Sequence, residues 1–194
     1  MNNNYFFKTL LATFLILFGI TFSYAQIPSY YDGTDISVSG QVLKGNLSTL
    51  VTATQTTELT YTPGVWDALK QTDLDPLNAN NVFLIYGYDD TDADGTNDRT
   101  RSKDMNGGNN GDWNREHTYP RSLGNPNLGS EGPGSDAHHL RASDVQFNGV
   151  RGNRPYIDDN GNAKPINGGF YPGDEWKGDV ARMMMYMYVR YGDR

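Results

Sequence analysis

Two stretches rich in glycine interrupt the middle of this 194-residue chain and limit the length of any helix or strand there. Residues 104–112 contain three glycines and three asparagines, and residues 123–135 contain four glycines and two prolines. Such segments form turns and loops, because glycine adopts backbone conformations closed to other residues and proline lacks a backbone N–H. With 22 glycines and 13 tyrosines in the chain, we expect short elements, long loops and aromatic packing, and we exclude a helical bundle.

Hydrophobic periodicity predicts both helices and strands around these loops. The apolar spacing of residues 40–51 predicts a short amphipathic helix, and a second helix is expected over 62–70, with Thr62 as N-cap and Pro63 at the first helical position. Residues 82–86 read as a buried strand. Apolar residues at three- and four-residue steps over 174–191 predict a last helix with Asp174 as N-cap. This mixture indicates an α+β fold.

The start of the chain has the pattern of an export signal. An almost unbroken apolar run covers residues 10–22, and Ser23-Tyr24-Ala25 places small residues where a signal peptidase reads them. The alternative is a membrane anchor, but the run is short for a span and polar residues follow at once. We therefore predict a signal peptide over 1–25 and one domain over 26–194. After cleavage near Ala25, the domain is expected to be secreted or periplasmic, outside the membrane and monomeric.

Cysteine and charge restrict the chemistry. The chain has no cysteine, which excludes disulfides, a cysteine nucleophile and thiolate metal sites. The net charge of −7 argues against a polyanionic ligand at first sight. Residues 99–154, however, carry eight basic and six acidic residues, so the middle of the chain is locally positive.

An acidic segment over 89–98 partly matches a calcium-binding loop. Asp90, Asp92, Asp94 and Gly95 follow its opening pattern, but Arg101 stands where a bidentate glutamate closes the coordination. We therefore favour a polar hairpin turn, with weak Ca²⁺ binding at the three aspartates as the alternative.

Two segments contain all three histidines, namely residues 113–122 and 136–155. In the second, Ser143 and Gln146 have the spacing of a capping box, which predicts a helix from about Asp144 to Arg151 that ends at Gly152. On that helix Asp144, Asn148 and Arg151 share one face. A carboxylate, an amide oxygen and a guanidinium together suit a hard cation and a phosphate.

The first segment adds the adjacent pair Glu116 and His117. Phosphodiester hydrolysis needs a base for water, a cation and donors that hold the phosphate. Histidine suits the base, and glutamate and asparagine oxygens suit Mg²⁺. Neighbouring residues on a strand point to opposite faces, so we expect a kink, bulge or turn, for example one imposed by Pro120, that brings both side chains to one site.

The combined pattern resembles the bacterial endonuclease I and extracellular ribonuclease family. It consists of Asn-Arg-Glu-His followed by Pro and Ser, then Asp-x-His-His-Leu-Arg-x-Ser-Asp, then Asn-Gly-x-Arg-x-Asn. The resemblance is strongest over 113–156 and implies a ββα-metal (His-Me finger) core with long loops and peripheral helices. It further implies a secreted, Mg²⁺-dependent endonuclease that binds DNA or RNA through backbone phosphates, without base specificity, and leaves 5′-phosphate ends.

The resemblance also implies residue roles. His117 would activate water as general base, Glu116 and Asn148 would hold Mg²⁺, and either Arg151 or Arg141 would contact the scissile phosphate. His138 is expected to orient or to support the fold.

The chain departs from the family pattern in several places. Asn114 stands where some members carry an acid, the disulfides of some members are absent, and relatives usually continue past the last helix. We therefore expect the domain to be C-terminally incomplete at Arg194. The rival hypotheses are a non-catalytic, calcium-stabilised secreted binding module and a metal phosphatase, which would need more carboxylates than the sequence offers.

Overall fold

The computed structural model describes residues 27–192, and the predicted signal peptide over 1–25 lies outside them. The chain divides into two compact units, residues 1–35 and 36–194. The described part of the first unit contains a single turn of 3₁₀ helix, η1 (Ser29–Tyr31). The start of the predicted domain at residue 26 stays a prediction. Among residues 27–192, no helix has both the length and the apolar character needed to cross a membrane.

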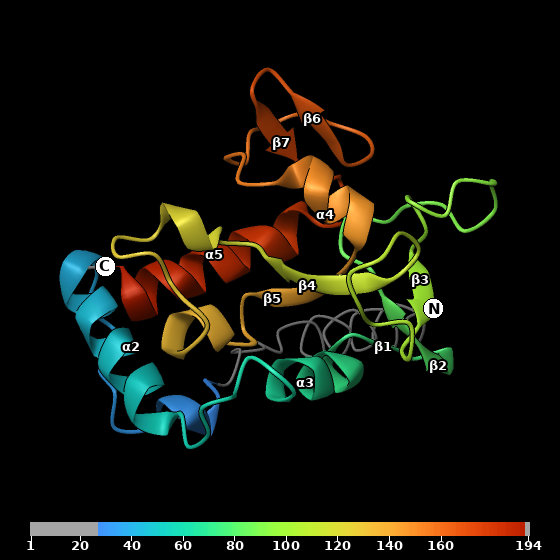
Figure 1. The fold of residues 1–194 in the computed structure, drawn as a ribbon. Helices are drawn as coiled ribbons and strands as arrows, with labels where there is room; N and C mark the ends of the chain where they lie inside the picture. The colour runs from blue at the N-terminus through green and yellow to red at the C-terminus, as the bar shows by residue number, and fades with distance from the viewer. Residues whose placement is uncertain (1–26, 193–194) are drawn as a thin grey trace, which may run out of the picture. The chain divides into compact units, whose positions relative to one another are not determined.

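The second unit is an α+β structure around a two-stranded hairpin, as the sequence predicts. Strand β4 (Trp113–His117) pairs antiparallel with β5 (Leu140–Asp144), and the chain then enters helix α4 (Val145–Arg151) directly. Helix α3 (Gly64–Thr72) covers one face of the hairpin and α4 the other (Figure 1). The alternation of β4 side chains explains this arrangement. Trp113 meets Trp66 of α3 edge to face at 5.1 Å, whereas Asn114 is hydrogen-bonded to Asn148 of α4.

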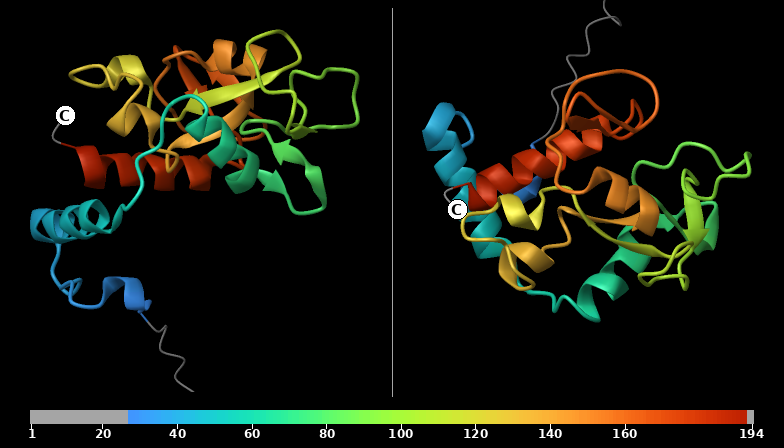
Figure 2. Two further views of the ribbon diagram at one scale, coloured as in Figure 1. Left: turned by 60° about the horizontal axis from the view of Figure 1, so that its bottom comes forward. Right: turned by 45° about the horizontal axis from the view of Figure 1, so that its top comes forward.

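Two further sheets accompany the hairpin. Strands β1 (Leu74–Asp75), β2 (Asn78–Phe83) and β3 (Thr100–Ser102) form an antiparallel sheet in that order. Strands β6 (Lys164–Ile166) and β7 (Gly169–Tyr171) form a second hairpin. Figure 2 shows both sheets as short ribbons joined by long loops, which is the organisation that the frequent glycines predict.

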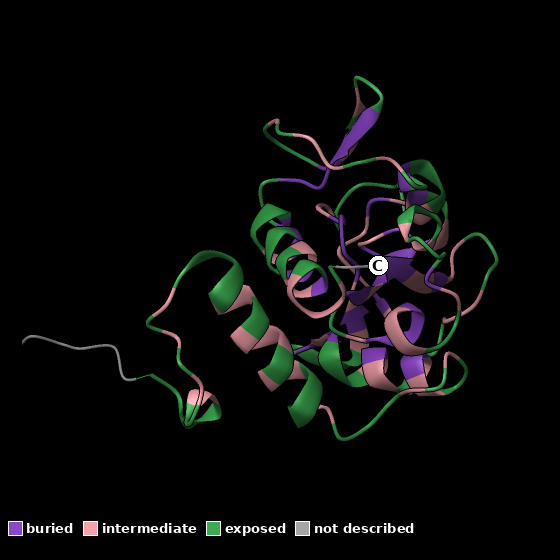
Figure 3. Ribbon diagram, turned by 90° about the vertical axis from the view of Figure 1, so that its left-hand side faces the viewer, coloured by how far each residue is buried: buried purple, intermediate pink, exposed green. Residues whose placement is uncertain are grey.

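Two long helices lie at the periphery. Helix α2 (Gly40–Thr54) packs on α5 (Lys177–Tyr191), and Arg190 donates to the carbonyl oxygen of Val51 at 2.8 Å. Figure 3 shows that α2 is exposed or half-buried along its length, whereas α5 turns buried residues inward. One buried cluster joins α3 to the β4–β5 hairpin, and another joins α4 to the β6–β7 hairpin and the start of α5.

The structure confirms the predicted helices and corrects some boundaries. Strand β2 ends at Phe83, earlier than the predicted 82–86. The next three residues are still buried, but the N–H groups of Leu84 and Ile85 donate to other segments. Tyr86 has a left-handed φ of 77°, which strand geometry does not allow. Helix α3 begins at Gly64, whose N–H donates to the hydroxyl of Thr60 at 3.2 Å, so Thr62 is not its cap.

The N-caps of α4 and α5 also differ from the expectation. Asp144, one residue after the predicted Ser143, accepts from the N–H of Phe147 at 2.8 Å and starts α4. Gly152 ends that helix as predicted, with a φ of 57°. Helix α5 begins after Trp176, and Asp174 instead accepts from the Tyr171 hydroxyl at 2.6 Å.

The acidic segment is a hydrogen-bonded loop between β2 and β3. Asp90 accepts from the N–H groups of Arg99 and Thr100, and Asp92 and Asp94 accept from N–H groups two residues ahead. Within residues 27–192 no group of three or more histidine or acidic side chains is arranged to hold a metal. The carboxylates therefore stabilise turns, as the hairpin interpretation predicts, and the Ca²⁺ alternative gains no support.

Candidate active site at the β4–β5 hairpin

The hairpin and α4 bring most of the predicted site residues to one cleft. A cavity of about 360 Å³ opens at the end of β4. Its lining includes four predicted residues: Glu116, His117, Asn148 and Arg151. Arg141 does not line this cleft, although it pairs with Glu116 across the strands, because its guanidinium Nε lies 2.9 Å from the buried carboxylate of Asp73.

Glu116 and His117 both reach the cleft without a bulge. The pairing of β4 with β5 is regular from Trp113 to His117, so of the expected kink, bulge or turn only a turn, after the strand, is found. His117 is instead the last residue of β4, and the chain bends at Thr118 and Tyr119 before Pro120. Because the strand ends here, side chains from both of its faces can line the same cleft.

The imidazole of His117 is held so that one nitrogen remains a base. Its Nε2 lies 2.9 Å from the carbonyl oxygen of Gly134, which can only accept, so Nε2 carries the proton and Nδ1 keeps a lone pair. Burial lowers the pKa of His117 to about 3, with the Gly134 carbonyl opposing this shift. The ring therefore stays neutral near pH 7, as a proton acceptor must.

A neighbouring histidine holds the same turn. His139 is fully buried, and its Nε2 lies 2.7 Å from the carbonyl oxygen of Pro133, the residue before Gly134. The centroid of its ring lies 5.5 Å from that of His117, and the ring of Tyr61 stacks on the His117 ring at 5.8 Å. The two histidines thus bind consecutive carbonyls of η3 (Gly132–Ser135) and fix the orientation of the His117 ring.

Glu116 lies at the floor of the cleft. Its side chain is 2% exposed, and its Oε1 accepts from the hydroxyl of Tyr86 at 2.6 Å and lies 3.2 Å from Nη1 of Arg151. Burial raises the pKa of Glu116 to about 7, partly offset by Arg151 and by the hydrogen bond from Tyr86. A buried carboxylate is stable where it is paired with a cation or coordinates a metal, and Arg151 is one such partner of Glu116.

Arg151 is a structural cation beneath the site. It is 1% exposed and donates to the carbonyl oxygens of His117 at 2.9 Å and Thr118 at 2.7 Å. Its guanidinium also lies over the ring of Tyr156 at 4.7 Å. These bonds fix the backbone just after the Glu116–His117 pair, so Arg151 positions the site from below.

Asn148 completes the set of oxygen donors. Its Nδ2 donates to Oδ1 of Asn114 at 2.7 Å, which leaves the side-chain oxygen Oδ1 of Asn148 available to a metal ion. A carboxylate and an amide oxygen are the hard ligands that Mg²⁺ takes, and this ion usually retains several waters. Two protein ligands in an open cleft therefore fit such an ion. Asn114 therefore orients the side chain of Asn148.

Sequence reasoning missed three arginines that surround the site. Arg115 and Arg121 line the cleft, and Arg154 lines the adjoining cavity. Within the described residues none of them has a carboxylate ion-pair partner, in a chain whose net charge is −7. The clustering of arginines in the middle of the sequence was the available signal.

The other residues outside the prediction are Tyr86 and Tyr156. The Tyr86 hydroxyl lies 2.5 Å from that of Tyr156, and this pair supports Glu116 from the side opposite the hairpin. No sequence signal linked either tyrosine to the site. His138 lies outside the cleft, exposed, with Nδ1 2.8 Å from Asp136 and its ring stacked on Tyr186 at 4.6 Å, which supports the expected structural role.

Comparison with known proteins gives a consistent picture. A family model described as Endonuclease I matches residues 39–194. The chain is 46% identical over 176 residues to the extracellular ribonuclease of Bacillus subtilis (strain 168), covering 87% of the chain and 55% of the relative. It is 46% identical over 174 residues to the extracellular ribonuclease of Bacillus amyloliquefaciens, covering 86% and 55%. The chain spans about half the length of these relatives. No solved structure matches it significantly.

Proposed function

The chain belongs to the endonuclease I family, and we propose that it acts outside the cytoplasm as a metal-dependent endonuclease that hydrolyses phosphodiester bonds of DNA or RNA without base specificity. One observation carries the proposal: a base-competent histidine, a buried carboxylate and an amide oxygen line a single cleft. The extracellular ribonucleases named above support both the substrate class and secretion.

In the proposed reaction, His117 takes a proton from the attacking water at Nδ1. Its Nε2–H bond to Gly134 keeps the ring in the required tautomer and stabilises the positive charge that develops on it. Glu116 and Asn148 would hold Mg²⁺, and β4, β5 and α4 are the elements that carry these two residues and His117. Bound there, Mg²⁺ supplies positive charge for the leaving 3′ oxygen. The 5′-phosphate stays on the product.

The phosphate contact is better assigned to Arg121 than to the predicted Arg151 or Arg141. The Arg151 guanidinium is occupied by backbone carbonyls, and Arg141 is paired with Asp73. Arg121 is half-buried at the rim of the cleft, has no carboxylate partner within the described residues, and has an Nε without a protein acceptor. A guanidinium in this setting is suited to hold a phosphate by two parallel hydrogen bonds.

The test is cleavage of plasmid DNA and of RNA by the purified mature chain with Mg²⁺, with EDTA, and with His117→Ala. The matched control is His138→Ala, which removes an imidazole outside the cleft. We expect cleavage that requires the metal, falls about 100-fold to 10,000-fold in His117→Ala, and persists in His138→Ala. End-group analysis should then find 5′-phosphates. A folded wild type that leaves both nucleic acids intact would instead favour the secreted binding module.

A further inference from the structure

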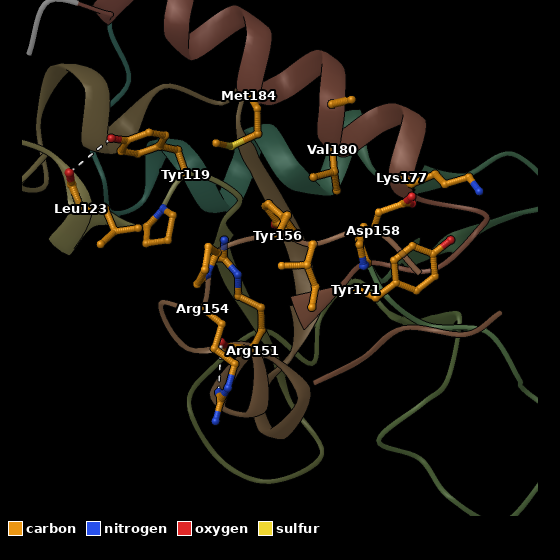
Figure 4. A pocket seen from close by; sticks show the side chains of 15 residues that line it. Tyr119, Leu123, Arg151, Arg154, Tyr156, Asp158, Tyr171, Lys177, Val180 and Met184 are labelled. Carbon is orange, nitrogen blue, oxygen red and sulfur yellow. Dashed lines mark hydrogen bonds between the residues drawn. The ribbon is translucent and has the colours of Figure 1, made fainter. Parts of the chain in front are cut away.

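A second cavity adjoins the candidate active site. It has a volume of about 440 Å³ and is shown in Figure 4. Pro120 and Arg151 line both this cavity and the cleft of Glu116 and His117, so the two adjoin. The proposed reaction leaves this second cavity unused. Its size lies within the usual range of small-ligand sites, which is about 300–1,000 Å³.

The lining of this cavity is mainly apolar and aromatic, and it also includes three cations and the carboxylate of Asp158. Figure 4 shows Tyr119 and Met184 on one side, Tyr156 at the centre and Tyr171 on the other side. Val180 and Met184 come from α5, and Ile157 and Pro155 from the loop after α4. Flat aromatic rings beside apolar side chains suit a flat, weakly polar ligand such as a nucleobase.

Charge complementarity links this cavity to a nucleic-acid strand. Arg121 lies at the cleft and Arg154 at the second cavity, and neither has a carboxylate partner within the described part of the chain. Lys177 adds a third cation at the cavity, paired with Asp174 at 2.6 Å. A phosphate backbone running from the cleft to the cavity would therefore meet positive charge at both ends.

We propose that this cavity, which we call the base pocket, binds an unstacked nucleobase next to the scissile phosphate. The base pocket is defined by Tyr119, Pro120, Tyr156, Ile157 and Met184. A base held in a duplex cannot enter such a pocket without leaving its stack, which costs free energy. The chain therefore favours single-stranded or locally unpaired substrate. This inference rests on the proposed nuclease function and specifies its substrate.

The test fills the pocket without touching the reaction centre. Ala181 is exposed on α5 and lines the cavity, so Ala181→Phe places a ring where the base would lie. The matched control is Met185→Phe, which adds the same ring to the same helix at a position 60% exposed and outside the cavity lining. Ala181→Met is a milder filling variant in case the larger ring disturbs folding, and thermal unfolding checks all three.

Binding is measured first, in EDTA, with a single-stranded tetranucleotide that contains 2-aminopurine and with its abasic analogue. We expect Ala181→Phe to weaken binding of the tetranucleotide about tenfold, Met185→Phe to leave it unchanged, and all the proteins to bind the abasic analogue equally and weakly. Equal affinity of wild type and both filling variants for the tetranucleotide would overturn the base pocket.

Cleavage with Mg²⁺ then separates the two proposals. We expect wild type to cut a single-stranded oligonucleotide at least about tenfold faster than the same sequence in a duplex, and Ala181→Phe to remove that preference. If wild type cuts the single-stranded and the duplex substrate equally fast, the base pocket is contradicted while the nuclease function stands. If no protein cuts either substrate, the nuclease function fails, and the binding comparison still decides whether the pocket takes a base.

Discussion

Nη1 of Arg151 lies 2.9 Å from the carbonyl oxygen of His117, and the same nitrogen lies 3.2 Å from Oε1 of Glu116. One buried cation therefore fixes both the backbone of the proposed general base and the side chain of the proposed metal ligand. The predicted functional arginine is thus part of the framework beneath the site, and this changes what its substitution should do.

We expect Arg151→Ala to lower the free energy of unfolding by about 3–5 kcal/mol, because the substitution leaves Glu116 buried without its cation. Arg151→Lys should recover little, since one ammonium cannot reproduce the planar set of bonds to two carbonyls. Urea denaturation measures both, with Arg121→Ala as a control that should unfold like wild type. An Arg151→Ala protein of unchanged stability that only loses affinity for nucleic acid would show that Arg151 contacts the phosphate instead.

Removal of either proposed metal ligand should weaken Mg²⁺ binding. We expect Glu116→Gln and Asn148→Ala to raise the Mg²⁺ concentration for half-maximal cleavage by at least about tenfold. Calorimetric titration of Mg²⁺ gives a second readout that does not depend on turnover. Asp94→Asn, in the acidic loop between β2 and β3, is the control and should titrate like wild type. A loss confined to Asp94→Asn would move the metal site to the acidic loop.

The salt dependence of binding should report the contact between Arg121 and phosphate. Each phosphate neutralised releases condensed counterions, so Arg121→Ala should reduce the slope of log K against log salt concentration by about 1. The control is Arg182→Ala, because Arg182 is an exposed cation on α5 that is paired with Asp179 and lies outside both cavities. An unchanged slope in Arg121→Ala, measured by fluorescence anisotropy in EDTA, would contradict the assignment.

The pH dependence of stability should reveal the His138–Asp136 pair. The hydrogen bond to Asp136 raises the pKa of His138 above its usual 6.5. Although burial opposes it, bonds from His138, Tyr186 and Tyr191 hold the pKa of Asp136 well below its ordinary range, so this carboxylate stays charged. The protonated form of His138 is therefore the stabilising one. Its contribution is complete below about pH 6.5 and is lost as pH rises through the higher folded pKa.

The comparison is between wild type and His138→Ala. The difference in their free energies of unfolding should shrink by about 0.5 kcal/mol from pH 5.5 to pH 9, a small value because His138 is exposed to solvent. Burial raises the pKa of Tyr191 to about 12 and that of Tyr186 as well, so both stay neutral over this range. A difference that is constant with pH would leave only the ring stacking on Tyr186 as the role of His138.

The sequence predicted the helices well because their evidence is local. Apolar spacing over 40–51 and 176–191, and the Gly152 signal after α4, each depend on residues a few positions apart. The same local patterns misplaced the N-caps by one or two residues. At the start of α4, for example, Ser143 and Asp144 are both good N-cap residues, and contacts with distant segments determine which of them caps the helix. Arg101 makes that decision, because its Nη1 lies 2.6 Å from Oδ2 of Asp144.

The site was predictable only as a set of residue types. Glu116, His117 and Asn148 were expected together and the structure brings them together. Burial was not predictable: the sequence suggested Arg151 or Arg141 for the scissile phosphate, and the structure encloses the guanidinium of Arg151. The hydrogen bond from Tyr86 to Glu116 was also not predictable. The two residues are 30 positions apart, and the left-handed conformation of Tyr86 has no signature in the hydrophobic periodicity.

The bonds that His117 and His139 make to Gly134 and Pro133 have a consequence for how this family can vary. They fasten the far end of the long β4–β5 connection. Earlier in that connection residues 125–126 are exposed and do not line the cleft, whereas Asn127 next to them does. Because doubling the length of a flexible loop costs only about 0.6 kcal/mol, insertions at this place are nearly neutral for stability. An insertion before Asn127 would therefore add surface beside the cleft while the carbonyls of Gly134 and Pro133 keep their bonds to the two histidines.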